Sequence, residues 1–158
     1  MELWDAYNRD FEKIENQSLI RGEEIPDGLY HLVCDVVVKH VDGTYLLMQR
    51  DNRKMHGGKW ELSAGGSVLQ GEEAWEGAQR ELLEETGISG NNMTELGRSV
   101  SDLHHSLHVI YLCVTDCNKE GIVLQEGETI AYSWRTMEEV KALKKEEFVS
   151  KRALGFLA

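Results

Sequence analysis

Apolar and polar positions alternate along this chain in short blocks that predict more strands than helices. Residues 30–39 form a β-branched apolar run typical of a buried strand, and residues 107–115 form the strongest later strand. Asp42-Gly43 is a turn signal, so we expect residues 44–50 to form a second strand that pairs with 30–39 as a hairpin. Further strands are predicted at 60–63 and 128–134.

Two segments carry the signals of helices. Residues 72–86 contain no proline and are rich in good helix formers, with Gly65-Gly66 before them and Gly87 after them as start and stop signals. Thr136 and Glu139 have the spacing of a capping box. This box predicts a final helix that ends at about residue 145 or continues through residue 148.

The amino-terminal residues predict a separate small element. Residues 3–7 form one arm of an edge hairpin closed through residues 8–10, and Pro26-Asp27-Gly28 is a turn signal. The sequence therefore predicts an α/β (α+β) fold, with a mixed β-sheet between α-helices and an N-terminal β-hairpin.

Composition limits the classes of partner. With 158 residues, 41% of them hydrophobic, the chain suits a single domain over residues 1–158, with a core at about 29–157 and an extension at 1–28. The net charge of −11 argues against a protein that coats nucleic acid or binds an anionic membrane, because those roles need a basic surface. An anionic substrate must then be met by bound cations and a few Arg or Lys side chains.

The amino terminus lacks a basic segment followed by an apolar run, and no stretch approaches 18 apolar residues. We therefore expect a cytoplasmic protein without membrane association, and the hairpin and acidic surface leave room for a homodimer. Cys34, Cys113 and Cys117 are odd in number and have no Cys-x-x-Cys spacing, so they are interpreted as buried small residues.

Three glutamates of the 72–86 helix share one face. At roughly 100° per residue, Glu81, Glu84 and Glu85 fall within an arc of about 100°. Like charges at this spacing destabilise a helix by a few tenths of a kcal/mol per pair, so a cation is expected to offset them. Carboxylate oxygens suit magnesium or manganese. The alternative is an ordinary solvated acidic face.

Small residues on this helix predict a close neighbour. Gly77 costs about 1 kcal/mol relative to Ala in mid-helix. Together with Ala74 and Ala78 it would let the Gly65-Gly66 loop approach, so that a backbone carbonyl serves as a further ligand. Arg80 is expected to form a fork with Glu72 or Glu84 and hold the carboxylates in register.

The spacing from Gly66 to Ile88 resembles the signature of the Nudix family: Gly66, five residues, Glu72, seven residues, Arg80-Glu81-Leu82, one residue, Glu84-Glu85, one residue, Gly87-Ile88. The similarity covers about residues 29–157. It implies the Nudix fold and a divalent-metal-dependent hydrolase that cuts a diphosphate linkage in a nucleoside diphosphate derivative or a similar small compound.

The resemblance and the helix geometry together define a predicted site. A further acid is implied a few residues before Trp134, which fits Glu128, with Glu126 as the rival and a solvated loop acid as the alternative. Arg50 ends a strand near the site and is expected to contact a phosphate, or else to be a surface arginine. The predicted metal ligands are Gly66, Glu81, Glu84 and Glu85, the catalytic residues Arg80, Glu84 and Glu128, and the substrate-binding residue Arg50.

Other interpretations stay open from the sequence. Residues 2–7 and 28–32 are similar to the Nudix branch that includes isopentenyl-diphosphate isomerases, but residues 60–66 lack the cysteine that those isomerases use. A nucleotide-binding or regulatory module that keeps the fold without turnover is the other alternative. His104, His105 and His108 are interpreted as strand or loop histidines, or as residues at the substrate mouth.

Overall fold

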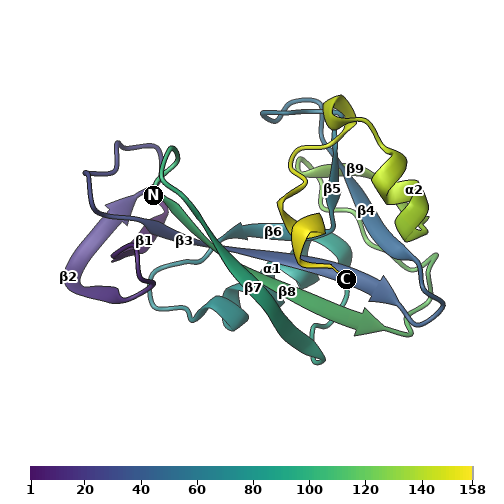
Figure 1. Cartoon of the computed structure of the whole chain (residues 1–158), viewed down its shortest axis with the longest axis horizontal. Coiled ribbons are helices and arrows are strands. Elements are labelled where there is room, and N and C mark those ends of the chain that lie inside the picture. Colours follow the sequence, from purple (N-terminus) through teal and green to yellow (C-terminus); the bar gives the residue numbers. More distant parts are fainter. Residues whose placement is uncertain (158) are drawn as a thin grey trace.

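A mixed sheet runs the length of the protein in the computed structural model, which describes residues 1–157 (Figure 1). Within those residues the sheet has seven strands in the order β5-β4-β3-β8-β7, with β6 beside β3 and β9 beside β4. The strands are β3 (His31–His40), β4 (Tyr45–Arg50), β5 (Trp60–Leu62), β6 (Ala64–Ser67), β7 (Met93–Ser101), β8 (Ser106–Thr115) and β9 (Thr129–Arg135). The parallel pair of β3 and β8, from His31 opposite Ser106 to His40 opposite Thr115, forms its centre.

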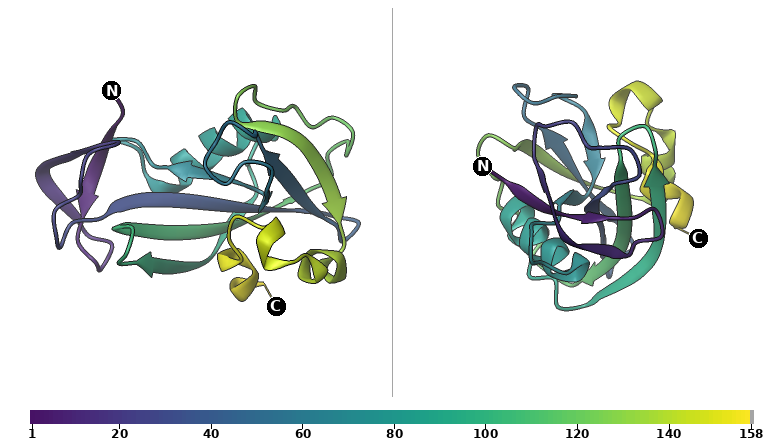
Figure 2. Two further views of the ribbon diagram at one scale, coloured as in Figure 1. Left: turned by 90° about the horizontal axis from the view of Figure 1, so that it is seen from above. Right: turned by 90° about the vertical axis from the view of Figure 1, so that its left-hand side faces the viewer.

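Helices and turns cover both faces of this sheet. Helix α1 (Ala74–Thr86) begins at a capping box of Glu73 and Glu76 and ends at Gly87, whose φ of 80° is left-handed. Helix α2 (Met137–Ala142) begins at the predicted capping box of Thr136, and two 3₁₀ turns follow, η1 (Lys145–Glu147) and η2 (Arg152–Phe156). The final helix is therefore shorter than predicted. Figure 2 shows α1 on one side of the sheet and the carboxyl-terminal segments on the other.

Side chains that alternate along β3 pack into two hydrophobic cores, one on each face of the sheet. Leu32, Cys34, Val36 and Val38 pack with Leu82 and the rest of the α1 side. Val37, on the other face of the same strand, packs with the α2 side. The mixed sheet between helices is thus confirmed.

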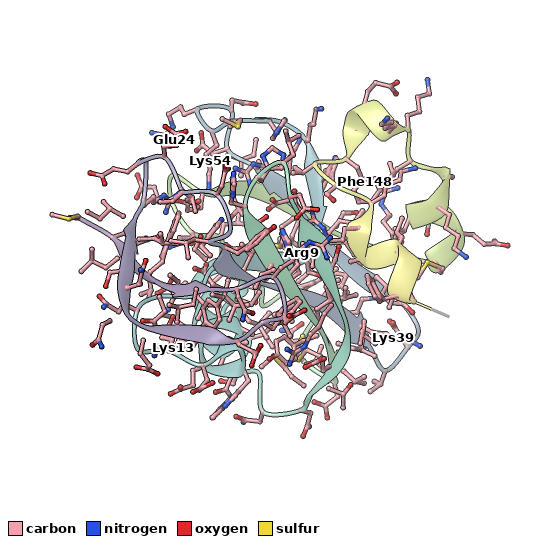
Figure 3. All side chains as sticks on the ribbon, turned by 60° about the vertical axis from the view of Figure 1, so that its left-hand side comes forward. Arg9, Lys13, Glu24, Lys39, Lys54 and Phe148 are labelled. Carbon is pink, nitrogen blue, oxygen red and sulfur yellow. The ribbon has the colours of Figure 1, made fainter. Side chains whose placement is uncertain are left out.

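The predicted N-terminal hairpin is also confirmed. Strands β1 (Leu3–Tyr7) and β2 (Lys13–Ile20) form a two-stranded sheet at the opposite end of the molecule from α2 (Figures 1 and 3). Two backbone hydrogen bonds of 2.9 Å join Tyr7 to Tyr30, and the Trp4 ring stacks on His31 at 4.1 Å. Burial lowers the pKa of His31 to about 4, so the stack is between neutral rings at neutral pH.

The predicted pairing of 30–39 with 44–50 is wrong for most of its length. Strands β3 and β4 pair at Lys39 and Tyr45, and β4 then turns away to pair with β9 and β5. The edge of β3 is taken instead by β6, from Val33 opposite Ser67 to Val36 opposite Ala64. Neither β6 nor β7 was predicted, because Ala-Gly-Gly-Ser has almost no side-chain pattern and β7 is largely polar.

Ser63 joins the two diverging strands. Its fully buried hydroxyl accepts a hydrogen bond from the Val38 N–H (2.9 Å) and donates one to the Leu46 carbonyl (2.6 Å). The hydroxyl thus satisfies backbone groups that the missing ladder would otherwise leave unpaired.

The three cysteines were expected to be buried small residues, and two of them are buried. Cys34 and Cys113 are buried and Cys117 is half-buried, and all three are free thiols within residues 1–157. No helix in this part of the chain has the length and apolar character needed to cross a membrane.

We expect Ser63→Ala to lower the free energy of unfolding by about 1–3 kcal/mol, because it leaves a buried donor and a buried acceptor without a partner. Urea unfolding followed by circular dichroism measures this change. Ser89→Ala, at an exposed position, is the matched control and should change stability by less than about 0.5 kcal/mol. Equal stability of the two variants would contradict the role of Ser63.

Candidate active site

The acidic face of α1 borders a groove of about 320 Å³. Glu81, Glu84 and Glu85 line it, together with Gly65 and Gly66 of β6. Four basic side chains line it as well, namely Arg21, Arg50, Lys54 and Arg80, together with Glu128. The groove therefore brings together all the predicted site residues.

Glu85 is the buried acid of the groove, with 7% of its surface exposed. Burial raises its pKa well above the ordinary value, and the charges of Glu81 and Glu61 raise it further. The Gly65 N–H donates to its Oε2 at 3.4 Å. Burial also raises the pKa of Glu81, although the hydrogen bond from Arg80 opposes this. The surrounding protein therefore supplies too little positive charge to stabilise both carboxylates in their ionised forms.

Arg80 forms the predicted fork. Its Nε and Nη2 donate to the two carboxylate oxygens of Glu72 at 2.8 and 3.0 Å. Its Nη1 donates to Glu81 at 2.9 Å and lies 3.4 Å from Glu84. Glu72 also accepts from the Leu69 N–H at 2.8 Å, so the fork ties the loop before α1 to the acidic face.

Gly66 leaves room for the Glu81 carboxylate where β6 approaches α1. A Cβ atom at this position would lie 2.5 Å from Glu81 Oε1. Gly77 has a different role from the predicted one, because a Cβ there would meet Val68 at 3.2 Å and Glu72 at 3.4 Å. Gly77 makes room for the loop that carries these residues, whereas Gly66 provides the close contact at the acids.

The donors in the groove fit a hard divalent cation, since they are carboxylate oxygens of a like-charged pair of which Glu85 is buried. Within residues 1–157 no three His, Cys, Asp or Glu side chains already converge on one point. Arg80 holds Glu81 and Glu84 toward its guanidinium, and the Gly66 carbonyl accepts from the Cys34 thiol at 3.4 Å. Binding of an ion would therefore require a shift of these side chains.

Glu128 and Glu126 differ in position. Glu128 lines the groove and forms an ion pair with Lys54, while Glu126 is exposed. The Asp51 N–H donates to the Glu128 carbonyl at 2.9 Å, which fixes the end of the loop between β8 and β9 beside the end of β4. Burial, followed by the charge of Arg50, lowers the pKa of Lys54. Arg50 itself donates to Glu61 at 2.6 Å.

Several groove residues carried no signal in the sequence. Arg21 and Glu2 reach the groove from the N-terminal hairpin and pair at 3.3 Å, and Glu2 also accepts from the Trp4 indole at 2.7 Å. Their placement depends on the docking of the hairpin, which spacing cannot reveal. Lys54 lies in the polar loop between β4 and β5, and the sequence does not indicate where this loop runs.

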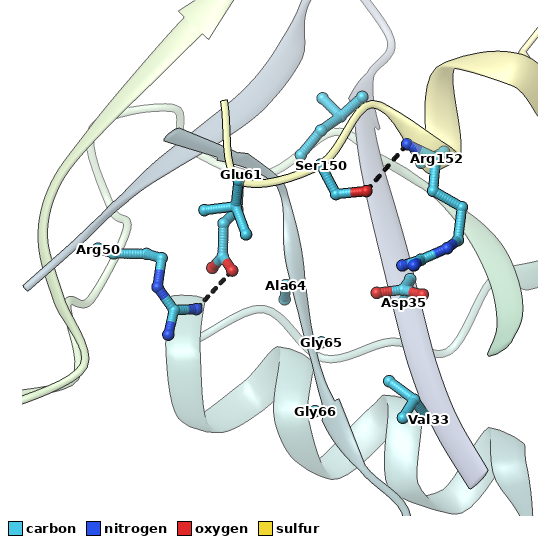
Figure 4. Close-up of a pocket in the computed structure, with 12 residues that line it drawn as sticks. Val33, Asp35, Arg50, Glu61, Ala64, Gly65, Gly66, Ser150 and Arg152 are labelled. Atoms are coloured by element: carbon cyan, nitrogen blue, oxygen red, sulfur yellow. Dashed lines mark hydrogen bonds and ion pairs between the residues drawn. The ribbon is translucent and has the colours of Figure 1, made fainter. Parts of the chain in front are cut away.

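The histidines separate as well. His104 is exposed in a turn, whereas His108 is buried on β8 and bonded to Asp35 of β3. Asp35 borders a second cavity on the other side of β6 (Figure 4). The parallel register that brings β8 beside β3 was not predicted, so this pairing could not be found from the sequence.

We expect Glu85→Gln to stabilise the protein without added metal at pH 7–8. A carboxyl whose folded pKa is raised favours folding at low pH and loses that contribution as the pH rises from about 4.5 through the folded pKa. Thermal unfolding across pH 5–8 in EDTA should therefore show a smaller loss of stability with rising pH for the variant than for the wild type. Magnesium should stabilise the wild type more than the variant. A variant less stable than wild type at pH 7–8 would contradict the charge repulsion.

Comparisons with known proteins agree with this geometry. A family model described as NUDIX domain matches residues 29–154. A Nudix hydrolase of Listeria monocytogenes is 30% identical over 145 residues, which cover 91% of this chain and 85% of that one. A Nudix hydrolase of Salmonella typhi is 32% identical over 143 residues, covering 89% and 76% of the two chains.

Solved structures share the fold. A Deinococcus radiodurans protein has a TM-score of 0.77 at 19% identity and covers 98% of this chain and 97% of its own. The NUDIX domain of NrtR from Shewanella oneidensis, solved with ADP ribose, has a TM-score of 0.60 at 20% identity and covers 73% and 78%. With the matched domain and the relatives above, the chain belongs to the Nudix hydrolase family, phosphoanhydride hydrolases that act on nucleoside diphosphate derivatives.

Proposed function

We propose that this protein uses divalent metal to hydrolyse the diphosphate linkage of a nucleoside diphosphate derivative or a similar small phosphorylated compound. The observation that carries the proposal is the pair of Glu81 and buried Glu85 beside Gly66, in a groove that the basic side chains of Arg21, Arg50 and Lys54 also line. A cation between the acids and the substrate would relieve their repulsion, and the basic side chains would receive the remaining negative charge.

Glu81, Glu84, Glu85 and the Gly66 carbonyl are the proposed ligands of magnesium or manganese. Bound metal would neutralise charge on the phosphoryl oxygens and lower the pKa of a bound water. Glu85 is held in place by burial, and Glu81 by the Arg80 fork. Glu84 is more exposed, so it is free to turn from Arg80 toward a ligand.

The remaining roles follow from position. Arg80 orients the acids through Glu72 and Glu81, and Glu128 is the proposed base that accepts the proton of the attacking water. Lys54 holds the Glu128 carboxylate at the groove. Arg50, at the end of β4, is the proposed phosphate contact.

We propose that residues 1–158 act as one domain, with the hairpin completing the groove through Arg21. A cytoplasmic location and a homodimer stay predictions from the sequence.

Neither alternative activity gains support from the groove. The isomerase reaction needs a thiol at the substrate, but Cys34 is fully buried behind Gly66 and burial raises its pKa. A module without turnover would be expected to lose some of the acids, and the groove keeps Glu81, Glu84, Glu85 and Glu128.

The test of the function is a panel of nucleoside diphosphate derivatives with product identification. We expect cleavage of a diphosphate linkage with magnesium or manganese, and a fall of at least about 100-fold in kcat when EDTA removes the metal, because charge on the phosphoryl oxygens is then uncompensated. Restoration by added magnesium is the control. No cleavage of any compound at any metal concentration would refute the proposal and favour a binding module.

Glu128 and Glu126 provide a matched pair for the base. We expect Glu128→Gln to lower kcat by about 10²- to 10⁴-fold, because a positioned proton acceptor is lost. Glu126→Gln carries the same change two residues away and should retain activity within about two-fold. Equal activities of the two variants would assign the proton to another group.

A further inference from the structure

A second cavity, of about 220 Å³, lies on the side of β6 opposite the acids (Figure 4). It meets the catalytic groove at Arg50, Gly65 and Gly66, which border both spaces. Its far side is closed by the carboxyl-terminal segment from Val149 to Ala153. A substrate held by its diphosphate in the groove can therefore extend one end past β6 into this cavity.

The size and walls of the cavity restrict what enters. Pockets for drug-sized ligands hold roughly 300–1,000 Å³, so this smaller space suits one ring more than a whole nucleoside. The apolar part of the wall is aliphatic, and none of the residues within 1–157 that line it is aromatic. A nucleobase would find no stacking partner here.

Asp35 presents a fixed acceptor to this space. Its Oδ2 lies 2.9 Å from His108 Nδ1, and His108 Nε2 lies 3.1 Å from the Ser106 hydroxyl. A carboxylate only accepts, so Nδ1 carries the hydrogen and donates it to Asp35. His108 and Ser106 are buried, which holds the carboxylate in one orientation. Residues 1–157 make no hydrogen bond to the other oxygen, Oδ1, and the Asp35 side chain is 27% exposed.

Arg152 supplies donors above Asp35 (Figure 4). Its Nη1 approaches His108 Nδ1 at 3.2 Å, but that nitrogen already carries a hydrogen turned to Asp35 and offers no acceptor. Among residues 1–157 no carboxylate oxygen lies within 4.0 Å of its guanidinium. The arginine donors are therefore available to a ligand.

We propose that this cavity binds a sugar ring of the substrate, with Asp35 Oδ1 accepting from one hydroxyl group and Arg152 donating to a neighbouring one. A hydroxyl both donates and accepts, so adjacent hydroxyls match a carboxylate beside a guanidinium. The opposite charges of the pair also disfavour a further phosphate, which Asp35 would repel. The proposal rests on the proposed hydrolase function and specifies the group that accompanies the diphosphate.

Three compounds distinguish whether the bound ring is the ribose of the nucleoside or a hexose. They are UDP-glucose, the ethyl ester of ADP, and the symmetrical diethyl diphosphate, which has no sugar. We expect Asp35→Asn to lower kcat/KM for UDP-glucose about 10- to 100-fold, chiefly through KM, because a charged hydrogen bond is lost. Diethyl diphosphate should change by less than about two-fold. A parallel loss with the ADP ester identifies the nucleoside ribose as the bound ring, and no loss there identifies the hexose.

Asp116→Asn makes the same change at an exposed site remote from the cavity and should leave all three values within about two-fold. Arg152→Gln should reproduce the selectivity of Asp35→Asn, and it carries the test if thermal unfolding shows that the Asp35 variant does not fold. Equal losses on all three compounds, or no loss on either sugar compound, would overturn the proposal.

If the wild-type protein cleaves none of these three compounds with magnesium, the full substrate panel decides the hydrolase function. Calorimetric binding of UDP-glucose then decides the role of the cavity. Binding that is at least about 10-fold weaker in Asp35→Asn than in wild type supports it, and equal binding or no binding by the wild type overturns it.

Discussion

The contact of β6 with α1 at Gly66 is the constraint on which the site depends. Glu81 reaches the backbone of β6 because position 66 has no side chain, and Arg80 holds Glu81 there while it also grips Glu72 in the preceding loop. Burial of Glu85 beside this contact follows from the same approach. The acidic face is thus anchored to backbone at several points, which lowers the freedom that a ligand would otherwise have to remove.

Local signals in the sequence predicted the helices and strands better than they predicted which strands pair. The α1 helix, the Thr136 capping box and the strand 107–115 depend on neighbouring residues, and each was found within a few positions. Pairing depends on residues distant in the chain. The turn at Asp42-Gly43 indicated a hairpin, but β6 displaced β4 from β3, and a buried serine hydroxyl made that divergence tolerable.

The same difference between local and long-range signals applies to the residues of the site. Glu81, Glu84, Glu85 and Arg80 share one helix, so their spacing was enough to group them. In the sequence, only the spacing from Trp134 favoured Glu128 over Glu126. In the structure Glu128 lines the groove, whereas Glu126 is exposed. Asp35, His108 and Arg152 come from β3, β8 and η2, and Arg21 comes from the docked hairpin. No periodicity links such residues, because tertiary packing alone brings them together.

Strand β6 carries only small side chains where it separates the two spaces. Ala64, Gly65 and Gly66 make a partition that is little thicker than the backbone itself, with acids on one side and the Asp35 cavity on the other. Under the proposed assignment, hydrolysis and substrate recognition would take place in two compartments built from different parts of the chain. Substitutions in the carboxyl-terminal segment, from Val149 to Ala153, would then change which compound is bound while the acidic residues of α1 stay intact.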